Sequence, residues 1–95
     1  MIKYLHDHIL EEIEGATDYW EKAVEHKGTE MGCWFKKMAE MELEHANCLT
    51  KMFNKAEKSD SMTGDEYAKM QKDVLSAYSE GMGKIESLKK LYWAL

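Results

Sequence analysis

The segment LHDHILEEIEGATDYWEKA, residues 5–23, decides the fold, because its apolar residues recur every three or four positions. This spacing predicts an amphipathic helix with one inward face. That face runs Leu5, Ile9, Glu12, Ala16, Tyr19 and Ala23. Glu12 is its only acidic residue, and a carboxylate on a packed face is costly unless a counter-charge or a metal ion meets it. Glu12 is therefore the first candidate functional residue.

A second segment has the same spacing and places two more polar residues on its inward face. That face is expected to run Phe35, Met38, Glu42, His45, Leu49, Met52 and Ala56. Gly28 and Thr29 mark the break between the helices, as a stop and an N-cap. In an antiparallel hairpin centred between them, facing residues have numbers that add up to about 57, as those of Glu12 and His45 do. Glu42 lies one turn away, so the hairpin should bring the three together.

The composition predicts one all-α domain over residues 1–95. The chain has no proline, one third of its residues are charged, and no segment is typical of strands. Helices are expected near residues 2–26, 30–58 and 64–93, the third starting at a capping box formed by Thr63 and Glu66. The inward stripe of the third helix is expected to run Tyr67, Met70, Val74, Ala77, Gly81, Ile85, Leu88, Tyr92 and Leu95.

Apolar residues outside these stripes exceed what a three-helix monomer needs. They are Ile13, Trp20, Val24, Trp34, Met41, Phe53, Tyr78, Met82 and Leu91. Three long helices bury too little of one another to close a core alone. We therefore expect a homo-oligomer, at least a dimer, in which the helical hairpins of two chains complete a four-helix bundle.

The charge and composition disfavour several classes of partner. A net charge of −5 argues against nucleic acid, and no apolar run is long enough to span a membrane. The expected location is cytoplasmic, or inside a protein shell or particle. Cys33 and Cys48 would lie about 22 Å apart on one helix, so we expect reduced thiols in or near the core. His6 and His8 are expected at the surface, where they could touch metal only if they lie close to the dimer axis.

The three polar residues form half of a di-iron ligand set. Glu42 and His45 are an i, i+3 pair, which places both side chains on one helix face. Di-iron bundles use two such pairs and two further glutamates, so two chains would supply a complete set of four glutamates and two histidines. Carboxylates with one imidazole per metal favour iron, while manganese and zinc are also compatible. Tyr19 is expected to hydrogen-bond a ligand carboxylate.

The run from Glu11 to Tyr19, followed thirty residues after Glu12 by Glu42-Leu43-Glu44-His45-Ala46, resembles the ferritin-like superfamily. The resemblance is closest to rubrerythrin-like half-bundles and encapsulated ferritins, which assemble their ferroxidase centre between two chains. It implies that Glu12, Glu42 and His45 are iron ligands, and that Glu11 and Glu14 lie near an iron entry path. The chain departs from this pattern in having Asp18, where an aromatic residue precedes the tyrosine.

These observations support a ferroxidase-type protein that oxidises Fe(II) with dioxygen or peroxide, for iron handling or oxidant protection. A non-enzymatic helical scaffold, for instance in a phage particle or shell, is an alternative with the same fold. A sensor or buffer of divalent metals is a third hypothesis. Without a metal, the triplet would be a hydrogen-bonded polar cluster that fixes the helix register.

Overall fold

The computed structural model describes residues 1–56 and 62–95, which form three helices and, within these ranges, no strand. They are α1 (Ile2–Glu25), α2 (Glu30–Lys55) and α3 (Gly64–Ala94). The predicted all-α architecture is confirmed, and two of the three predicted ends differ by a single residue. The second helix ends at Lys55, so its predicted end at residue 58 is wrong: Ala56 is already extended. Residues 57–58 and most of the linker after them lie outside the described residues.

The turns are built by the residues that the sequence marked as breaks. Gly28 adopts a φ of 89°, which only glycine tolerates well. The hydroxyl of Thr29 then accepts a hydrogen bond from the Gly32 amide at 3.1 Å and caps α2. Thr63 does the same for α3 by accepting from the Glu66 amide at 3.1 Å. These caps start both helices and fix the hairpin between α1 and α2.

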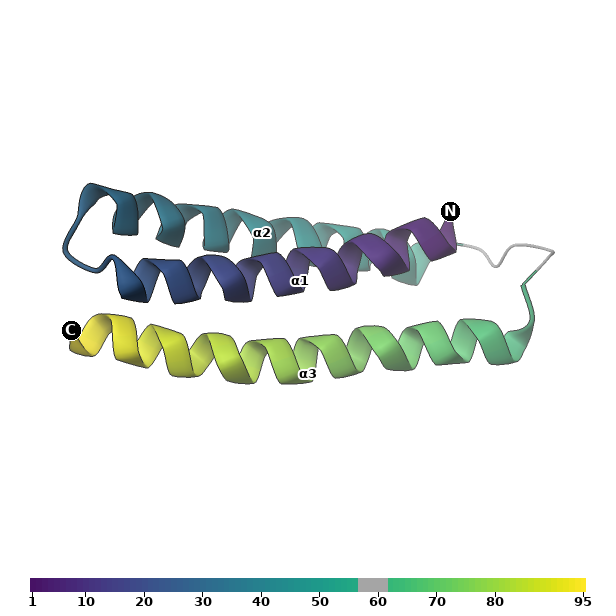
Figure 1. Cartoon of the computed structure of the whole chain (residues 1–95). Helices are drawn as coiled ribbons and strands as arrows, with labels where there is room; N and C mark the ends of the chain where they lie inside the picture. Colours follow the sequence, from purple (N-terminus) through teal and green to yellow (C-terminus); the bar gives the residue numbers. More distant parts are fainter. Residues whose placement is uncertain (57–61) are drawn as a thin grey trace.

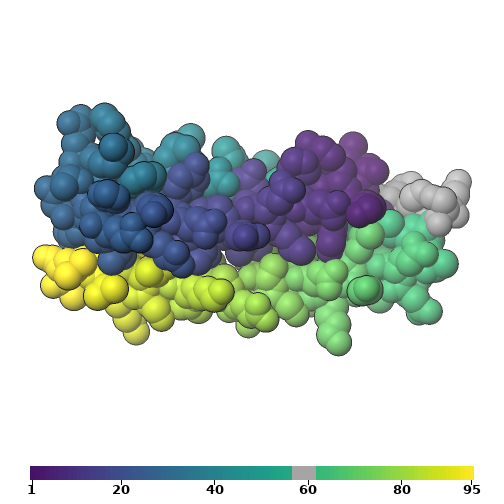
Figure 2. All heavy atoms as spheres, viewed as in Figure 1, coloured from purple at the N-terminus to yellow at the C-terminus, as the bar shows by residue number. Residues whose placement is uncertain are grey.

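α1 is the central helix of the molecule. α2 runs antiparallel to it on one flank, and α3 runs parallel to it on the other (Figure 1). No Cα atom of α2 lies within 8 Å of a Cα atom of α3. The result is an elongated body, 51 × 19 × 15 Å, in which α3 covers one side of α1 along its whole length (Figure 2). Among the described residues, no third helix therefore lies on the far side of the α1–α2 hairpin.

The inward face of α1 is wider than the predicted one. Leu5, Ile9, Ala16 and Ala23 are buried as expected. Ile13 and Trp20, which we expected on a spare edge available for self-association, are buried too. That expectation is wrong because α3 covers this edge: the Trp20 ring lies edge-on to Tyr92 with 5.7 Å between centroids.

α2 is rotated relative to the prediction. Its buried residues are Gly32, Ala39, Ala46 and Phe53, so the predicted inward placement of Met38, His45 and Met52 is wrong. The two alanines, which we call the alanine line of α2, are fully buried in core clusters with residues of α1. Seven exposed residues at steps of three and four form what we call the outer α2 seam: Met31, Trp34, Met38, Met41, His45, Cys48 and Met52.

The packing stripe of α3 largely follows the prediction. Val74, Gly81, Ile85 and Tyr92 are buried, whereas Leu95 at the chain end is 65% exposed. A Cβ atom on Gly81 would collide with the side chain of Ile13 on α1. The glycine therefore permits a close approach of α1 and α3, as its position in the stripe suggested.

Polar ties hold α3 to α1 near both of its ends. The ring nitrogens of His6 lie 2.7 Å from Asp7 and 2.9 Å from Asp73 on α3. At the other end, Lys27 donates a hydrogen bond to the Tyr92 carbonyl and lies 4.0 Å from the centre of the Tyr92 ring. His6 was expected at the surface, but its side chain is only 13% exposed, because it bridges two helices.

Two further expectations concern thiols and membranes. Cys33 and Cys48 are both exposed, so their predicted place in or near the core is wrong; both point away from the alanine line of α2. None of the helices in the described ranges is long and apolar enough to cross a membrane.

Candidate metal centre

The three polar residues singled out in the sequence meet at the middle of the α1–α2 hairpin. Glu12 comes from α1, while Glu42 and His45 come from α2. Each offers a ligand atom, and these three atoms all lie within 4.8 Å of one another. His45 Nδ1 is 3.6 Å from Glu12 Oε2. The pairing of Glu12 with His45 is the one expected from the hairpin register.

Small residues make room for the carboxylates. A Cβ atom on Gly15 would lie 2.7 Å from Glu42 Oε2, a distance that real Cβ atoms do not tolerate. The missing side chain of Gly15 thus leaves a cradle on α1 in which the Glu42 carboxyl group lies. Gly15 stands one turn after Glu12, so the same stretch of α1 supplies one ligand and positions a second.

The electrostatics of the cluster reflect two carboxyl groups in contact. A hydrogen bond with Glu12, then partial burial and the negative charge of Glu12, raise the pKa of Glu42 to about 7. The nearby His45 lowers the pKa of Glu42 and so partly offsets this rise. Glu42 is therefore protonated in most molecules below pH 7, and a cation would replace that proton.

One oxygen atom of the cluster is left unsatisfied. Glu12 Oε2 is buried and has no hydrogen-bond partner among the described residues. Its nearest basic atom, His45 Nδ1, is beyond hydrogen-bonding distance. A buried carboxylate oxygen that accepts no hydrogen bond is unfavourable even beside an imidazole, and a bound cation would satisfy it. The donor set of two carboxylates and one imidazole suits iron, manganese or zinc.

The cluster opens to solvent on the side of the hairpin that α3 does not cover. A cavity of about 260 Å³ there is lined by residues of both helices: Tyr4, His8, Glu12, His45, Cys48 and Leu49. The side chain of His45 is 57% exposed, whereas that of Glu12 is 22% exposed. Of the three cluster residues, Glu12 and His45 therefore line this cavity, whereas Glu42 does not.

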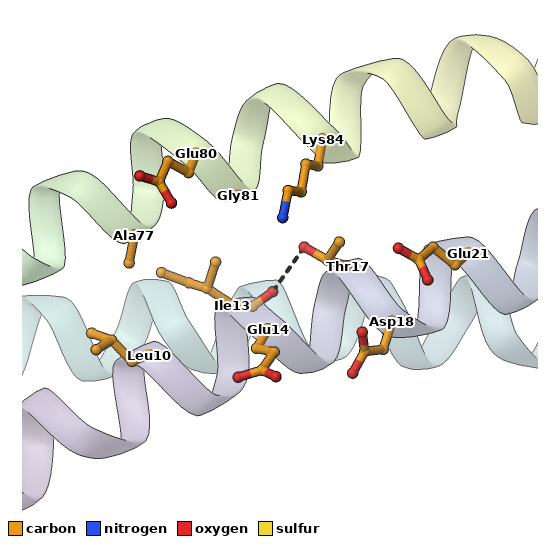
Figure 3. A pocket seen from close by; sticks show the side chains of 10 residues that line it. All are labelled: Leu10, Ile13, Glu14, Thr17, Asp18, Glu21, Ala77, Glu80, Gly81 and Lys84. Carbon is orange, nitrogen blue, oxygen red and sulfur yellow. Dashed lines mark hydrogen bonds between the residues drawn. The ribbon is translucent and has the colours of Figure 1, made fainter.

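The secondary residues suggested by the sequence lie in different places. Glu11 is exposed on α1, 3.7 Å from His8 Nδ1. Glu14 lies in a separate groove between α1 and α3, together with the acidic side chains of Asp18, Glu21 and Glu80 (Figure 3). The structure therefore does not bring Glu14 to the cluster.

Tyr19 lies beside the cluster on α1 but faces another neighbour. Its ring stacks on Phe35 with 6.1 Å between centroids, where the hairpin rule had predicted Met38. It makes no hydrogen bond with another residue in the described ranges. Its expected hydrogen bond to a ligand carboxylate is therefore absent from this conformation.

Two residues beside the cluster, Gly15 and Cys48, were not identified from the sequence. Gly15 was read only as part of a motif, although its spacing of three from Glu12 is a usable signal. Cys48 stands three residues after His45, which places it on the same face of α2 and at the mouth of the cavity. Neither glycine nor cysteine by itself indicates a place beside a metal site, because both residue types also occur on ordinary helix surfaces.

No family model, curated protein or solved structure matches this chain.

Proposed function

We propose that this protein is a ferritin-like metal-binding protein that oxidises Fe(II) with dioxygen or peroxide. The observation that carries the proposal is the convergence of Glu12, Glu42 and His45 around a buried carboxylate oxygen that has no hydrogen-bond partner among the described residues. Iron is the substrate ion that this donor set suits best, and manganese or zinc would compete for the same site. The resemblance of the Glu12 and Glu42–His45 segments to encapsulated ferritins supports the same reaction.

The site is completed by a second copy of the chain. One chain supplies only half of the four glutamates and two histidines with which helical bundles hold two iron ions. The open side of the cluster adjoins the outer α2 seam, an apolar surface that the chain itself leaves uncovered. A two-fold dimer through this surface brings together four glutamates and two histidines, enough for two metal ions.

The residues in and around the cluster would have distinct roles in metal binding. Glu12 and Glu42 would bridge the metals or bind one of them, and His45 would supply one nitrogen ligand per metal. Glu11 lies at the exposed rim and attracts cations to the site. Tyr19 turns toward the ligand carboxylates when metal is bound. Glu14, in the opposite groove, contributes only to the negative charge of α1.

Metal analysis tests the proposal directly. The protein should bind about one iron per chain and consume Fe(II) with oxygen. Glu42→Ala should lose both properties, whereas Glu80→Ala, which removes an exposed carboxylate from α3, should retain them. Stoichiometric metal content in Glu42→Ala would show that the cluster is not the site.

A second candidate is favoured by the outer α2 seam. Four methionines and a tryptophan on this surface are each 40% to 54% exposed, which is typical of a surface that assembles with other chains. A helical scaffold or assembly protein, in a particle or shell, would use this surface without any turnover. A folded oligomer with no metal and no response to Fe(II) would favour this alternative.

A further inference from the structure

The outer α2 seam has the periodicity of a surface that pairs with another helix. Met31, Met38, His45 and Met52 are spaced by seven residues, and Trp34, Met41 and Cys48 stand between them at steps of three and four. This is the alternation by which two helices interlock along their length. The surface is exposed and continuous, and a two-fold axis would place it against itself.

Charges along the outer edge of the seam are arranged so that they could pair with a second copy. Glu30, Lys37, Glu44 and Lys51 follow one another every seven residues, alternate in sign and are all exposed. None of them forms an ion pair with another residue in the described ranges. The inner edge, which lies against α1, instead carries three half-buried residues: Phe35, Glu42 and Leu49.

In one antiparallel register, all of these outer charges find opposite partners. When Met31 lies opposite the partner's Cys48, Glu30 faces the partner's Lys51 and Lys37 faces the partner's Glu44. We call this the paired-charge register. It offsets the two Glu42 residues by one heptad, about 10 Å along the helix axis. The two copies then cannot share a metal pair.

A slide of seven residues gives the second apolar register, with the opposite properties. Met38 then lies opposite the partner's Cys48, and the two Glu42 carboxyl groups face each other across the axis. On the outer edge, however, Lys37 meets the partner's Lys51, and the two Glu44 residues meet each other. We call this the shared-site register. Without a cation it gathers like charges at several positions.

We propose that metal binding sets the register of the dimer, the paired-charge register holding without metal and the shared-site register with it. The inference rests on the proposed function, since the cation must bridge the two Glu42 side chains. Exposed ion pairs are individually weak, so the two registers differ little and coordination bonds are sufficient to reverse the preference. Both registers bury the same seam, so the change is a slide of one α2 helix along the other.

Disulfide trapping distinguishes the registers through the native thiol of Cys48. In a Cys33→Ser background, the Met31→Cys variant should cross-link two chains only in the paired-charge register, and Met38→Cys only in the shared-site register. Within a chain the two thiols are about 25 Å or about 15 Å apart, so an internal disulfide cannot form. Under mild oxidation the Met31→Cys variant should cross-link without metal. Excess Mn²⁺ should abolish that cross-link and produce the Met38→Cys cross-link.

A charge reversal tests the role of the outer edge without touching the ligands. Lys51→Glu makes Glu30 repel its partner in the paired-charge register and makes Lys37 attract its partner in the shared-site register. In metal-free protein this change should move the cross-link from the Met31→Cys variant to the Met38→Cys variant. Lys72→Glu, which makes the same charge change on an exposed site of α3, should leave the cross-link pattern unchanged.

The other outcomes overturn the proposal in distinguishable ways. Cross-linking of the Met38→Cys variant without metal would show that the outer charges do not choose the register. Cross-linking of the Met31→Cys variant that persists in Mn²⁺ would show that metal does not move it. Metal content measured on the same samples then tells whether Mn²⁺ was bound, so this failure is separate from failure of the proposed metal site. Absence of any cross-link would exclude an antiparallel seam dimer.

Discussion

At the scale of single residues, the candidate site depends on an absent side chain as much as on its ligands. Ala at position 15 would place a methyl group 2.7 Å from Glu42 Oε2 and force the carboxyl group out of its cradle. In a helix, replacing glycine with alanine otherwise stabilises by up to about 1 kcal/mol. We expect Gly15→Ala to lower metal affinity at least about tenfold, since a displaced ligand typically costs that much. Titration with Mn²⁺ measures this effect.

Gly83→Ala is the matched control for this change. Gly83 is a helical glycine on α3, and a Cβ atom there would have no neighbour within 4 Å. It should raise the free energy of unfolding by about 0.5–1 kcal/mol and leave metal affinity unchanged. Equal metal affinity in both variants would show that Glu42 does not need the cradle.

The raised pKa of Glu42 predicts how the stability of the metal-free protein depends on pH. The pKa is 4.5 in the unfolded chain and about 7 in the folded protein, so folding is favoured when Glu42 is protonated. This contribution is complete below pH 4.5 and is lost as the pH rises through 7. Because Glu42 is only half-buried, we expect it to amount to about 1–2 kcal/mol.

Thermal unfolding in the presence of a chelator measures this dependence. Between pH 5 and pH 8 the Tm of the wild type should fall more than that of Glu42→Gln, which remains neutral throughout. Parallel curves for the two proteins would contradict a shared proton at the cluster. Metal affinity should move the other way, rising with pH up to about 7 because the cation displaces that proton.

At the scale of elements, the positions of the helices and of the ligand cluster could be predicted, but the rotation of α2 could not. Gly28, Thr29 and Thr63 fix the helix ends by local chemistry, and the hairpin register follows from the turn. α2, however, has two possible inward stripes one residue apart, 38–45–52 and 39–46–53, and only the second is wholly apolar. The pattern alone favours the methionines, whereas the structure uses the alanines because they allow the backbones of α1 and α2 to approach. His45 is exposed for the same reason.

The attachment of α3 to α1 can also be tested as a property of the element. His6 contacts carboxylates on both helices, and a neutral imidazole has one N–H, so only the protonated ring donates to both. Removing it with His6→Ala should destabilise the protein by about 1–2 kcal/mol. Hydrogen exchange should accelerate in the first half of α3 and remain slow in the α1–α2 hairpin.

Lys3→Ala provides the comparison for this effect. Its ion pair with Asp7 is exposed and lies within α1, so its loss should change the free energy of unfolding by less than about 0.5 kcal/mol. If His6→Ala behaved like Lys3→Ala, the tie between His6 and Asp73 would not hold α3 in place.

At the scale of the whole molecule, the uneven covering of the hairpin separates its two faces. α3 buries the side of α1 that includes Ile13 and Trp20, a face that the sequence could equally assign to self-association. What remains uncovered is the side with the cluster and the outer α2 seam. The sequence shows that surplus apolar residues exist, but their division between α3 and a partner depends on packing between distant segments, which periodicity does not encode.

Because the cluster and the outer α2 seam share one uncovered face, a substitution that disrupts the seam should abolish both dimerisation and metal binding. Met41 stands at the middle of the outer α2 seam and is 50% exposed, so Met41→Glu places a charge in the proposed interface without touching Glu12, Glu42 or His45. We expect the wild type to sediment as a dimer and Met41→Glu as a monomer. Because each monomer retains only three ligands, its metal content should fall well below one per chain.

Leu75→Glu is the control at this scale, because Leu75 is 71% exposed on α3 and lies outside the seam. It should remain dimeric and retain its metal, as the wild type does. A monomeric Met41→Glu protein that still bound one metal per chain would show that the hairpin alone completes the coordination. The outer surface of α2 would then serve assembly only, and the scaffold function would become the better explanation of its exposed methionines.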